Sequence, residues 1–234
     1  MTEVTLGPCR LILADCLDVL PSLKVDAVIT DPPYGYNYES NHTCSTTTAA
    51  WMNKPIMGDS DTSLRDMVLA WCDNRPSACF GSWRMPKPEK TKGVLIWDKG
   101  PASGMGDLSF PWKGSWEEIY ICGKGWSGDR DEGVLKGHTV VTRASMGRVH
   151  PNEKPVSLLS HLVQKLPQSF VILDPFMGSG TTGIACIRTG RKFVGIERDP
   201  THFATACERI ERELSQPMLF DPTTPPPLHQ PDLI

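Results

Sequence analysis

The sequence predicts an α/β fold with an open, mostly parallel sheet, and two observations predict it. Two short apolar runs, residues 11–14 and 27–30, each end near an acidic residue, Asp15 and Asp31. Farther along, residues 170–197 have the order strand, glycine-rich turn, helix, strand, acid, which is typical of a nucleoside-binding βαβ half-unit. Because ligands bind at the carboxyl ends of strands in open α/β sheets, the acids at these ends are candidate site residues.

Length and composition are those of an ordinary globular protein. The chain has 234 residues, of which 39% are hydrophobic and 22% are charged. This is enough to bury a sizeable core, and we expect residues 1–214 to form one domain. The formal net charge of −3 argues against a strongly basic nucleic-acid coat. Any contact with DNA must therefore come from a local patch.

The sequence shows neither a membrane span nor an export signal. No apolar run approaches the roughly 18 residues that cross a bilayer. Residues 1–4 lack the basic start of a secretion signal, so we expect a cytoplasmic protein with no membrane partner. The 8 Cys include no Cys-x-x-Cys pair, so we expect reduced thiols and no metal site.

The first predicted strand, 11–14, is followed by a short helix through Leu20 that Pro21 ends. Asp15 can cap this helix, take part in a site, or do both. The next strand is expected at 26–30. Its apolar, β-branched run at 27–30 stops before two prolines, as a buried strand ending in a loop does.

Asp31-Pro32-Pro33-Tyr34 forms a stiff loop after that strand. Each proline fixes φ at about −65° and lacks a backbone donor, so the free polar groups of the loop are mainly acceptors. The Asp31 carboxylate adds an acceptor and Tyr34 adds a flat ring. Together they suit a planar group that carries an NH2, such as a nucleobase. A Pro-Pro turn with a capping Asp is the simpler interpretation of these four residues alone.

The middle of the chain alternates short elements with loops. Residues 36–63 are polar without a clear period, and we interpret them as a mobile, substrate-facing loop, although a surface insertion without a role has the same pattern. Residues 123–149 are rich in glycine and basic residues and are the candidate DNA-contacting segment, a small target-recognition unit. The other expected elements are a helix at 67–72, strands at 77–83, 94–97 and 116–122, and a loop at 98–115.

The last third of the chain has the clearest pattern. An amphipathic helix begins with Pro155 in its first turn, and a proline-rich tail occupies 215–234. The elements expected between them are a strand at 170–173, a helix through Arg188, a strand at 193–196 that ends at Glu197, and a helix capped by Asp199.

The turn after strand 170–173 reads Asp174-Pro175-Phe176-Met177-Gly178-Ser179-Gly180-Thr181-Thr182-Gly183. Gly178 and Gly180 let a ligand approach the backbone closely. The turn lacks the Lys of a P-loop and the full Gly-x-Gly-x-x-Gly of dinucleotide sites, and Asp174 would repel a pyrophosphate. An adenosine that carries a cationic sulfonium fits an acid-lined turn better. A tight turn that caps a helix is the simpler alternative.

The two motifs together resemble those of amino-methylating DNA methyltransferases that use S-adenosylmethionine. The order, catalytic motif first and cofactor motif last, resembles the β group of that family. The match covers residues 9–35 and 150–213 well and is weaker between them. The resemblance implies a doubly wound, Rossmann-like methyltransferase sheet with a permuted chain order. It also implies S-adenosylmethionine as the cofactor and double-stranded DNA as the substrate.

The resemblance also implies roles residue by residue. The residues of the catalytic motif are Asp31, Pro32, Pro33 and Tyr34. The implied cofactor-binding residues are Asp174 near the methionine amino group, Phe176, Gly178, Ser179 and Gly180 in the loop, Thr181 and Lys154 near the methionine carboxylate, Glu197 at the ribose, and Asp15 near the adenine.

The expected reaction is methylation of the exocyclic amine of a flipped adenine, because Asp at the first motif position leans towards adenine N-6 in this family. Cytosine N-4 methylation by the same machinery and a catalytically silent DNA-binding module are the open alternatives. No nucleophilic Cys is expected, and Cys9 is interpreted as structural. The resemblance is compatible with a homodimer and with a paired restriction nuclease.

Overall fold

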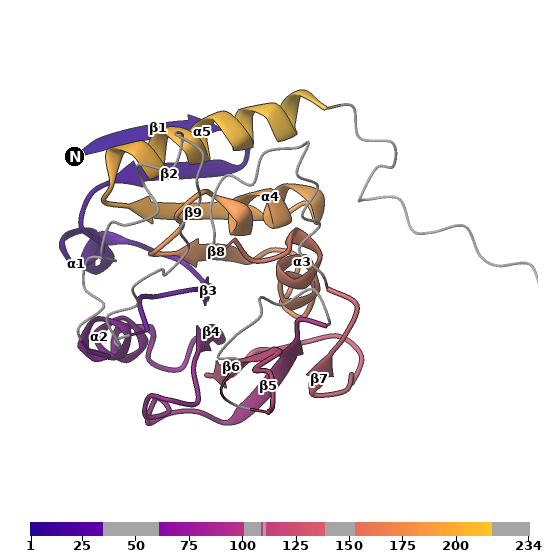
Figure 1. Cartoon of the computed structure of the whole chain (residues 1–234). Helices are drawn as coiled ribbons and strands as arrows, with labels where there is room; N and C mark the ends of the chain where they lie inside the picture. Colours follow the sequence, from indigo (N-terminus) through magenta and orange to yellow (C-terminus); the bar gives the residue numbers. More distant parts are fainter. Residues whose placement is uncertain (35–60, 101–108, 110, 139–152, 217–234) are drawn as a thin grey trace, which may run out of the picture.

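A computed structural model describes residues 1–34, 61–100, 109, 111–138 and 153–216 (Figure 1). In these residues nine strands form one sheet, in the order β1-β2-β9-β8-β3-β4-β6-β5-β7. The strands are β1 (Thr2–Leu6), β2 (Cys9–Leu13), β3 (Ala27–Thr30), β4 (Ser77–Gly81), β5 (Gly93–Asp98), β6 (Trp116–Cys122), β7 (Val134–Leu135), β8 (Val171–Asp174) and β9 (Lys192–Glu197). The five neighbours β2, β9, β8, β3 and β4 run parallel, as predicted, whereas β1 and β6 run antiparallel to their neighbours.

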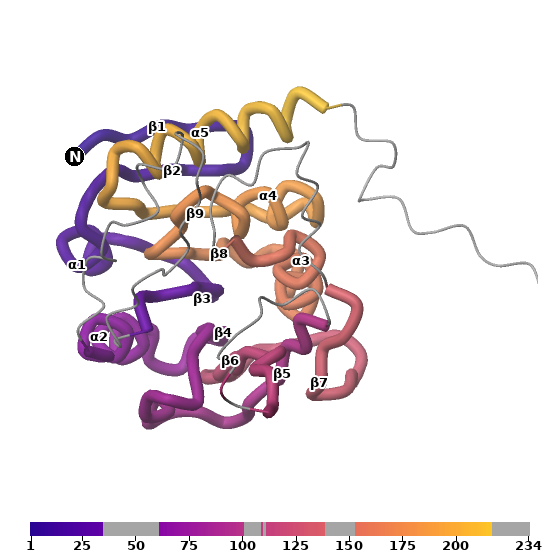
Figure 2. Tube along the Cα trace, in the orientation of Figure 1, coloured from indigo at the N-terminus to yellow at the C-terminus, as the bar shows by residue number. Residues whose placement is uncertain are grey.

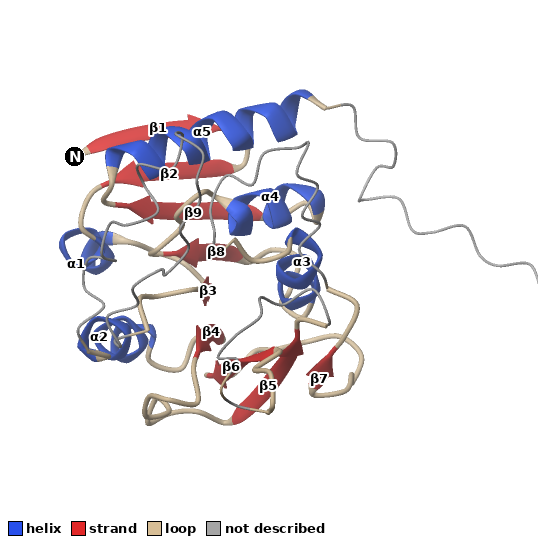
Figure 3. Ribbon diagram, viewed as in Figure 1, coloured by secondary structure: helices blue, strands red, loops and turns tan. Residues whose placement is uncertain are grey.

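Helices cover both faces of this sheet (Figure 3). They are α1 (Cys16–Val19) with the 3-10 turn η1 (Leu20–Ser22), α2 (Ser63–Cys72), α3 (Val156–Gln164), α4 (Thr181–Arg188) and α5 (Pro200–Ser215). Ala27 and Ile29 of β3 pack into the hydrophobic cluster with α3, α4 and α5, whereas Val28 packs into the cluster with α1 and α2. Successive side chains of a strand point to opposite faces, so a strand buried on both faces is apolar throughout.

The direction of winding reverses between β8 and β3. From β8 the chain continues through α4 to β9 on one side, and from β3 it continues through α2 to β4 on the other side. The two helices lie on opposite faces of the sheet. This arrangement is a topological switch point, where open α/β sheets bind their ligands. The permuted order is visible in the trace, in which the N-terminal β1 and β2 lie beside β9 and α5 (Figure 2).

Three local features differ from the sequence expectations. The sequence did not predict β1 or the short β7, because β1 is a half-polar edge strand without a long apolar run. Helix α2 begins at Ser63, inside the predicted loop at 36–63. Pro155 is the N-cap of α3, not a first-turn residue, since its ψ of 133° is extended.

Parts of four predicted segments lie outside the described residues: 36–60 of the substrate-facing loop, 101–108 and 110 of the loop at 98–115, 139–149 of the candidate DNA-contacting segment, and 217–234 of the tail. Within the described ranges, no helix combines the length and apolar character that crossing a bilayer requires.

Candidate active site

The two sequence motifs meet at the switch point of the sheet. Asp31 follows β3 directly, and Asp174 is the last residue of β8, which pairs with β3. Thr30 Oγ1 donates a hydrogen bond of 2.8 Å to Asp174 Oδ1. Thr182, in the first turn of α4, donates one of 2.6 Å to Asp174 Oδ2. Asp174 therefore joins the last residue before the Asp-Pro-Pro-Tyr loop to the helix that follows the glycine turn.

Asp174 is nearly inaccessible to solvent, with 3% of its surface exposed. Its two threonine donors and the Phe176 backbone amide, at 3.1 Å, are all neutral. Burial raises the pKa of Asp174 to about 6. The charge of this carboxylate is thus poorly compensated by its hydrogen-bond partners, and a cation beside it would be stabilised.

The glycine turn brings backbone close to this carboxylate. Gly180 is the N-cap of α4 and has a φ of +80°, in the left-handed region that favours glycine. A Cβ at Gly180 would lie 3.1 Å from Ala206 Cβ of α5. Gly178 has a φ of +50°, but a Cβ there would meet no heavy atom within 4 Å. The turn is therefore closed against α5 at Gly180 and open at Gly178.

Substituting Gly180 and Gly178 in turn tests how much the close contact between the glycine turn and α5 affects stability. We expect Gly180→Ala to lower the free energy of unfolding by about 2 kcal/mol, because left-handed strain and the contact with Ala206 add. Gly178→Ala should cost about 1 kcal/mol, from strain alone. Urea denaturation of both variants checks this. Equal costs would show that the close approach of α5 has no energetic effect.

Glu197 closes β9, and backbone amides hold its carboxylate in place. Oε2 accepts from the Gly178 amide at 3.0 Å, and Oε1 accepts from the amides of Arg198 and Asp199 at 2.9 and 2.8 Å. A carboxylate has about four lone-pair sites, so capacity for a further donor remains. The predicted ribose acid thus borders the open part of the glycine turn.

Asp15 lies at the same edge, after β2. Its Oδ1 accepts from the Leu17 amide at 3.0 Å, so it caps α1, which is one of the roles predicted for it. The preceding residue, Ala14, donates from its amide to the Glu197 carbonyl at 3.0 Å. Asp15 is exposed beside Glu197, and its role at the adenine stays a prediction.

Arg209 of α5 fixes the end of the glycine turn, which the sequence did not reveal. Its guanidinium donates to the Ser179 carbonyl and to Ser179 Oγ, both at 2.6 Å, and it also contacts Glu153. Thr181 Oγ1 donates to Glu153 Oε1 at 3.3 Å. Glu153 and Arg209 together therefore hold Ser179 and Thr181 in position.

Lys154 lies against the Asp-Pro-Pro-Tyr loop. Its ammonium is 2.7 Å from Asp31 Oδ2 and 3.2 Å from Glu117 Oε2, and it donates to the Tyr34 hydroxyl at 3.1 Å. Only 8% of the side chain is exposed. The described contacts of Lys154 are thus with the catalytic loop, and its contact with the methionine carboxylate stays a prediction.

Glu117 of β6 is the second residue that the sequence did not reveal. It accepts from the Tyr34 hydroxyl at 3.3 Å and also pairs with Lys99, which follows β5. Two adjacent acids, Glu117 and Glu118, interrupt an otherwise apolar strand, and that signal could have identified it. Because side chains alternate along a strand, one of two adjacent acids must point to each face.

Two lysines and two carboxylates form one cluster of ion pairs at the catalytic loop: Lys99, Lys154, Asp31 and Glu117. Burial raises the pKa of Asp31, although the Lys154 ammonium acts in the opposite direction. Burial acts to raise the pKa of Glu117 too, but Lys154 and Lys99 outweigh it, and the pKa is lowered. Burial would lower the pKa of Lys154, but Asp31 and Glu117 raise it instead. Lys154 and Glu117 are therefore charged at neutral pH.

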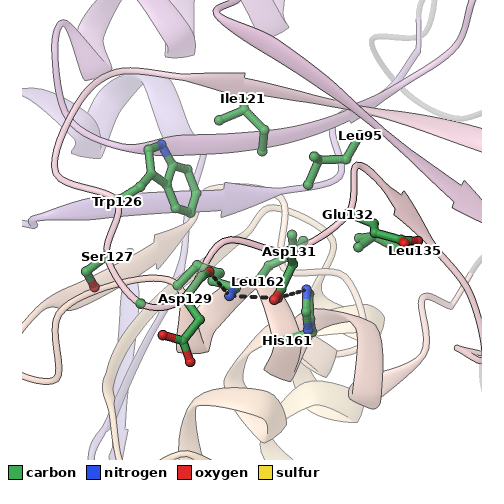
Figure 4. A pocket seen from close by; sticks show the side chains of 12 residues that line it. Leu95, Ile121, Trp126, Ser127, Asp129, Asp131, Glu132, Leu135, His161 and Leu162 are labelled. Carbon is green, nitrogen blue, oxygen red and sulfur yellow. Dashed lines mark hydrogen bonds and ion pairs between the residues drawn. The ribbon is translucent and has the colours of Figure 1, made fainter.

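A cavity of about 300 Å³ lies elsewhere, between β5, β6, β7 and α3 (Figure 4). Apolar side chains such as Leu95, Trp126 and Leu162 line it, and Asp131 pairs with Lys165 at 2.6 Å on its rim. None of the predicted catalytic or cofactor residues is among its lining residues. The cavity is thus separate from the candidate active site at the ends of β3 and β8.

Comparison with known proteins bears on the family and the fold of the chain. The model of the DNA methylase family matches residues 87–208. The protein YubD of Escherichia coli (strain K12), whose name assigns it to the methylases, is 29% identical over 198 residues, which cover 80% of this chain and 84% of YubD.

Two solved structures have a similar fold. The M1.HpyAVI-SAM complex has a TM-score of 0.59 at 22% identity and covers 86% of this chain and 99% of the other. The PvuII DNA methyltransferase, described as cytosine-N4-specific, has a TM-score of 0.59 at 16% identity and covers 86% of each chain. The predicted Rossmann-like methyltransferase fold is therefore confirmed.

Proposed function

This chain belongs to the DNA methylase family, and from that membership we propose that it transfers a methyl group from S-adenosylmethionine to the exocyclic amine of a base in double-stranded DNA. The proposed target is N-6 of a flipped adenine. The supporting observation is the hydrogen bond of 2.8 Å between Thr30 and Asp174, which links the catalytic loop to the glycine turn. The acceptor Asp31 and the proposed cofactor site thus share one edge of the sheet.

S-adenosylmethionine supplies a methyl group on a cationic sulfur, and the residues present fit this molecule. Asp174 is a buried acid with neutral donors, suited to the cationic amino group of the methionine part. Open space at Gly178 suits a ligand that lies against the backbone. Glu197 would accept from a ribose hydroxyl, with Ser179, Gly180 and Thr181 shaping the turn and Phe176 beside it.

Cofactor affinity should depend on pH because of Asp174. Its pKa is about 6 in the free protein. A cationic amino group nearby stabilises the carboxylate and lowers that pKa, so binding releases a proton and affinity rises with pH. We expect affinity to fall as the pH drops below about 6, and to fall less steeply in Asp174→Asn. Isothermal titration calorimetry between pH 5 and 8 tests this. An identical pH dependence in Asp174→Asn would assign it to another group.

The protein aligns and polarises the amine without forming a covalent intermediate. A base inside a duplex cannot reach the site and must be extruded, and Tyr34 would stack on it. Asp31 and the Pro32 carbonyl would accept the two amine hydrogens. This localises the nitrogen lone pair and aims it at the methyl group. No thiol nucleophile is required, and Cys9 lies in the core, where burial raises its pKa to about 12.

Cytosine N-4 methylation is the second candidate, because both amines present the same two hydrogens to the acceptors. The test is nucleoside mass analysis, with sequencing that detects modified bases, of DNA from cells that lack other amino-methylases and express this protein. We expect N-6-methyladenine in one sequence context. N-4-methylcytosine would select the second candidate. Unmodified DNA would favour a silent DNA-binding module. A homodimer and a paired nuclease remain predictions from the resemblance.

A further inference from the structure

In the free protein both oxygens of the Asp31 carboxylate already have donors. Oδ1 accepts from the Tyr34 hydroxyl at 2.9 Å, and Oδ2 accepts from the Lys154 ammonium at 2.7 Å. In the proposed function, on which this inference rests, the same carboxylate must accept a hydrogen of the substrate amine. Each of these two donors draws electron density from the carboxylate, so Asp31 accepts more strongly from the amine once a donor moves away.

Glu117 offers a second acceptor to both of these donors. Its Oε2 is 3.2 Å from the Lys154 ammonium and 3.3 Å from the Tyr34 hydroxyl. The other oxygen of Glu117 is held by Lys99. Glu117 is 18% exposed, so a hydrogen bond there is shielded from most of the solvent. A small shift of either donor towards Glu117 would release an oxygen of Asp31.

The surroundings of Lys154 restrict the partners that its ammonium can reach. Its ammonium lies 5.0 Å from the centre of the Phe80 ring and 5.5 Å from that of the Tyr34 ring. With 8% of its surface exposed, it cannot exchange Asp31 for bulk water. A buried ammonium needs an anion within reach. Among the contacts described for Lys154, Glu117 is the carboxylate other than Asp31.

We propose that Glu117 is a positioning residue that takes over Lys154 and the Tyr34 hydroxyl when the target base enters, leaving Asp31 free to accept from the amine. The step exchanges hydrogen bonds only. No covalent bond forms or breaks, and Lys154 keeps its proton throughout. Lys99 keeps Glu117 charged and in place during the exchange.

The experiment measures single-turnover methyl transfer to a duplex that contains the mapped target site. Glu117→Gln keeps the shape but removes the charge. We expect its transfer rate to fall roughly 10- to 100-fold, the size of a lost hydrogen bond to a charged group. The dissociation constants for cofactor and duplex should stay within about twofold. Glu117 belongs neither to the proposed cofactor site nor to the candidate DNA-contacting segment, and its proposed action comes after both have bound. Glu117→Asp should recover part of the rate.

Glu118→Gln is the matched control, since Glu118 is the next residue of β6 and bonds Tyr120 at 2.6 Å instead. Its transfer rate should match that of the wild type. A double-mutant cycle with Lys154→Met tests whether Glu117 acts through Lys154. In the Lys154→Met background, we expect Glu117→Gln to lower the transfer rate by less than about threefold.

Three outcomes would overturn the inference in a wild type that transfers methyl groups: an unchanged rate in Glu117→Gln, a parallel loss of cofactor binding or thermal stability, or an undiminished effect in the Lys154→Met background. A wild type that binds the cofactor and transfers nothing would instead refute the proposed function.

Discussion

Replacing Asp31 by asparagine is expected to lower the methyl-transfer rate by roughly 100- to 1000-fold, as removal of a preorganised transition-state contact does. The amide keeps the size of the side chain but presents one acceptor and one donor. Its donor would face the amine hydrogens, or its single acceptor would stay occupied by Tyr34 or Lys154. The amine lone pair would then remain delocalised in the ring.

Cofactor affinity should be unaffected by Asp31→Asn. The groups that shape the glycine turn are Asp174, Glu197 and Arg209, and the described hydrogen bonds of Asp31 run to Tyr34 and Lys154 instead. Asp18→Asn, at an exposed acid of α1, is the control for charge. Wild-type turnover in Asp31→Asn would refute the role of this residue. A parallel loss of cofactor binding would show that it acts on the fold of the site.

Glu197→Gln should weaken cofactor binding by roughly 10- to 100-fold. Both carboxylate oxygens accept from backbone amides, Oε2 from Gly178 and Oε1 from Arg198 and Asp199. A glutamine places an NH2 group against at least one of these N–H donors, so the turn must shift. The remaining acceptor capacity for a ribose hydroxyl is lost with it.

Calorimetric titration of the cofactor measures this effect. Glu213→Gln is the control, because Glu213 pairs with Arg188 at 2.6 Å near the end of α5, away from the turn. Unchanged affinity in Glu197→Gln would remove Glu197 from the cofactor site. A comparable loss in Glu213→Gln would mean that α5, and not the carboxylate, controls binding.

Local patterns in the sequence were enough to place most of the fold and the two motifs. The β-branched run of β3 ends at two prolines, and the apolar run of β8 ends at a glycine turn, so both ends could be located without the structure. Asp199 caps α5 through the amides of Thr201 and His202, as predicted. Each of these features depends on neighbouring residues alone.

Features that depend on pairing between distant strands could not be predicted. Glu117 reaches the loop after β3 because β4 is the one strand between β3 and β6 in the sheet. That order brings it to Lys154, which precedes α3. Arg209 likewise meets Ser179 only because α5 packs on the turn. The adjacent acids of β6 could single out Glu117, but neither spacing nor periodicity shows which residues Glu117 and Arg209 meet.

The central claim is that Asp31 presents an exocyclic amine to a methyl group held at the neighbouring glycine turn. The most direct measurement uses the purified protein, a duplex that contains the mapped site, and S-adenosylmethionine with a deuterated methyl group. Tandem mass spectrometry then locates the label within the modified nucleoside. We predict the label on the exocyclic nitrogen of adenine. A label on a ring carbon or ring nitrogen would contradict the account.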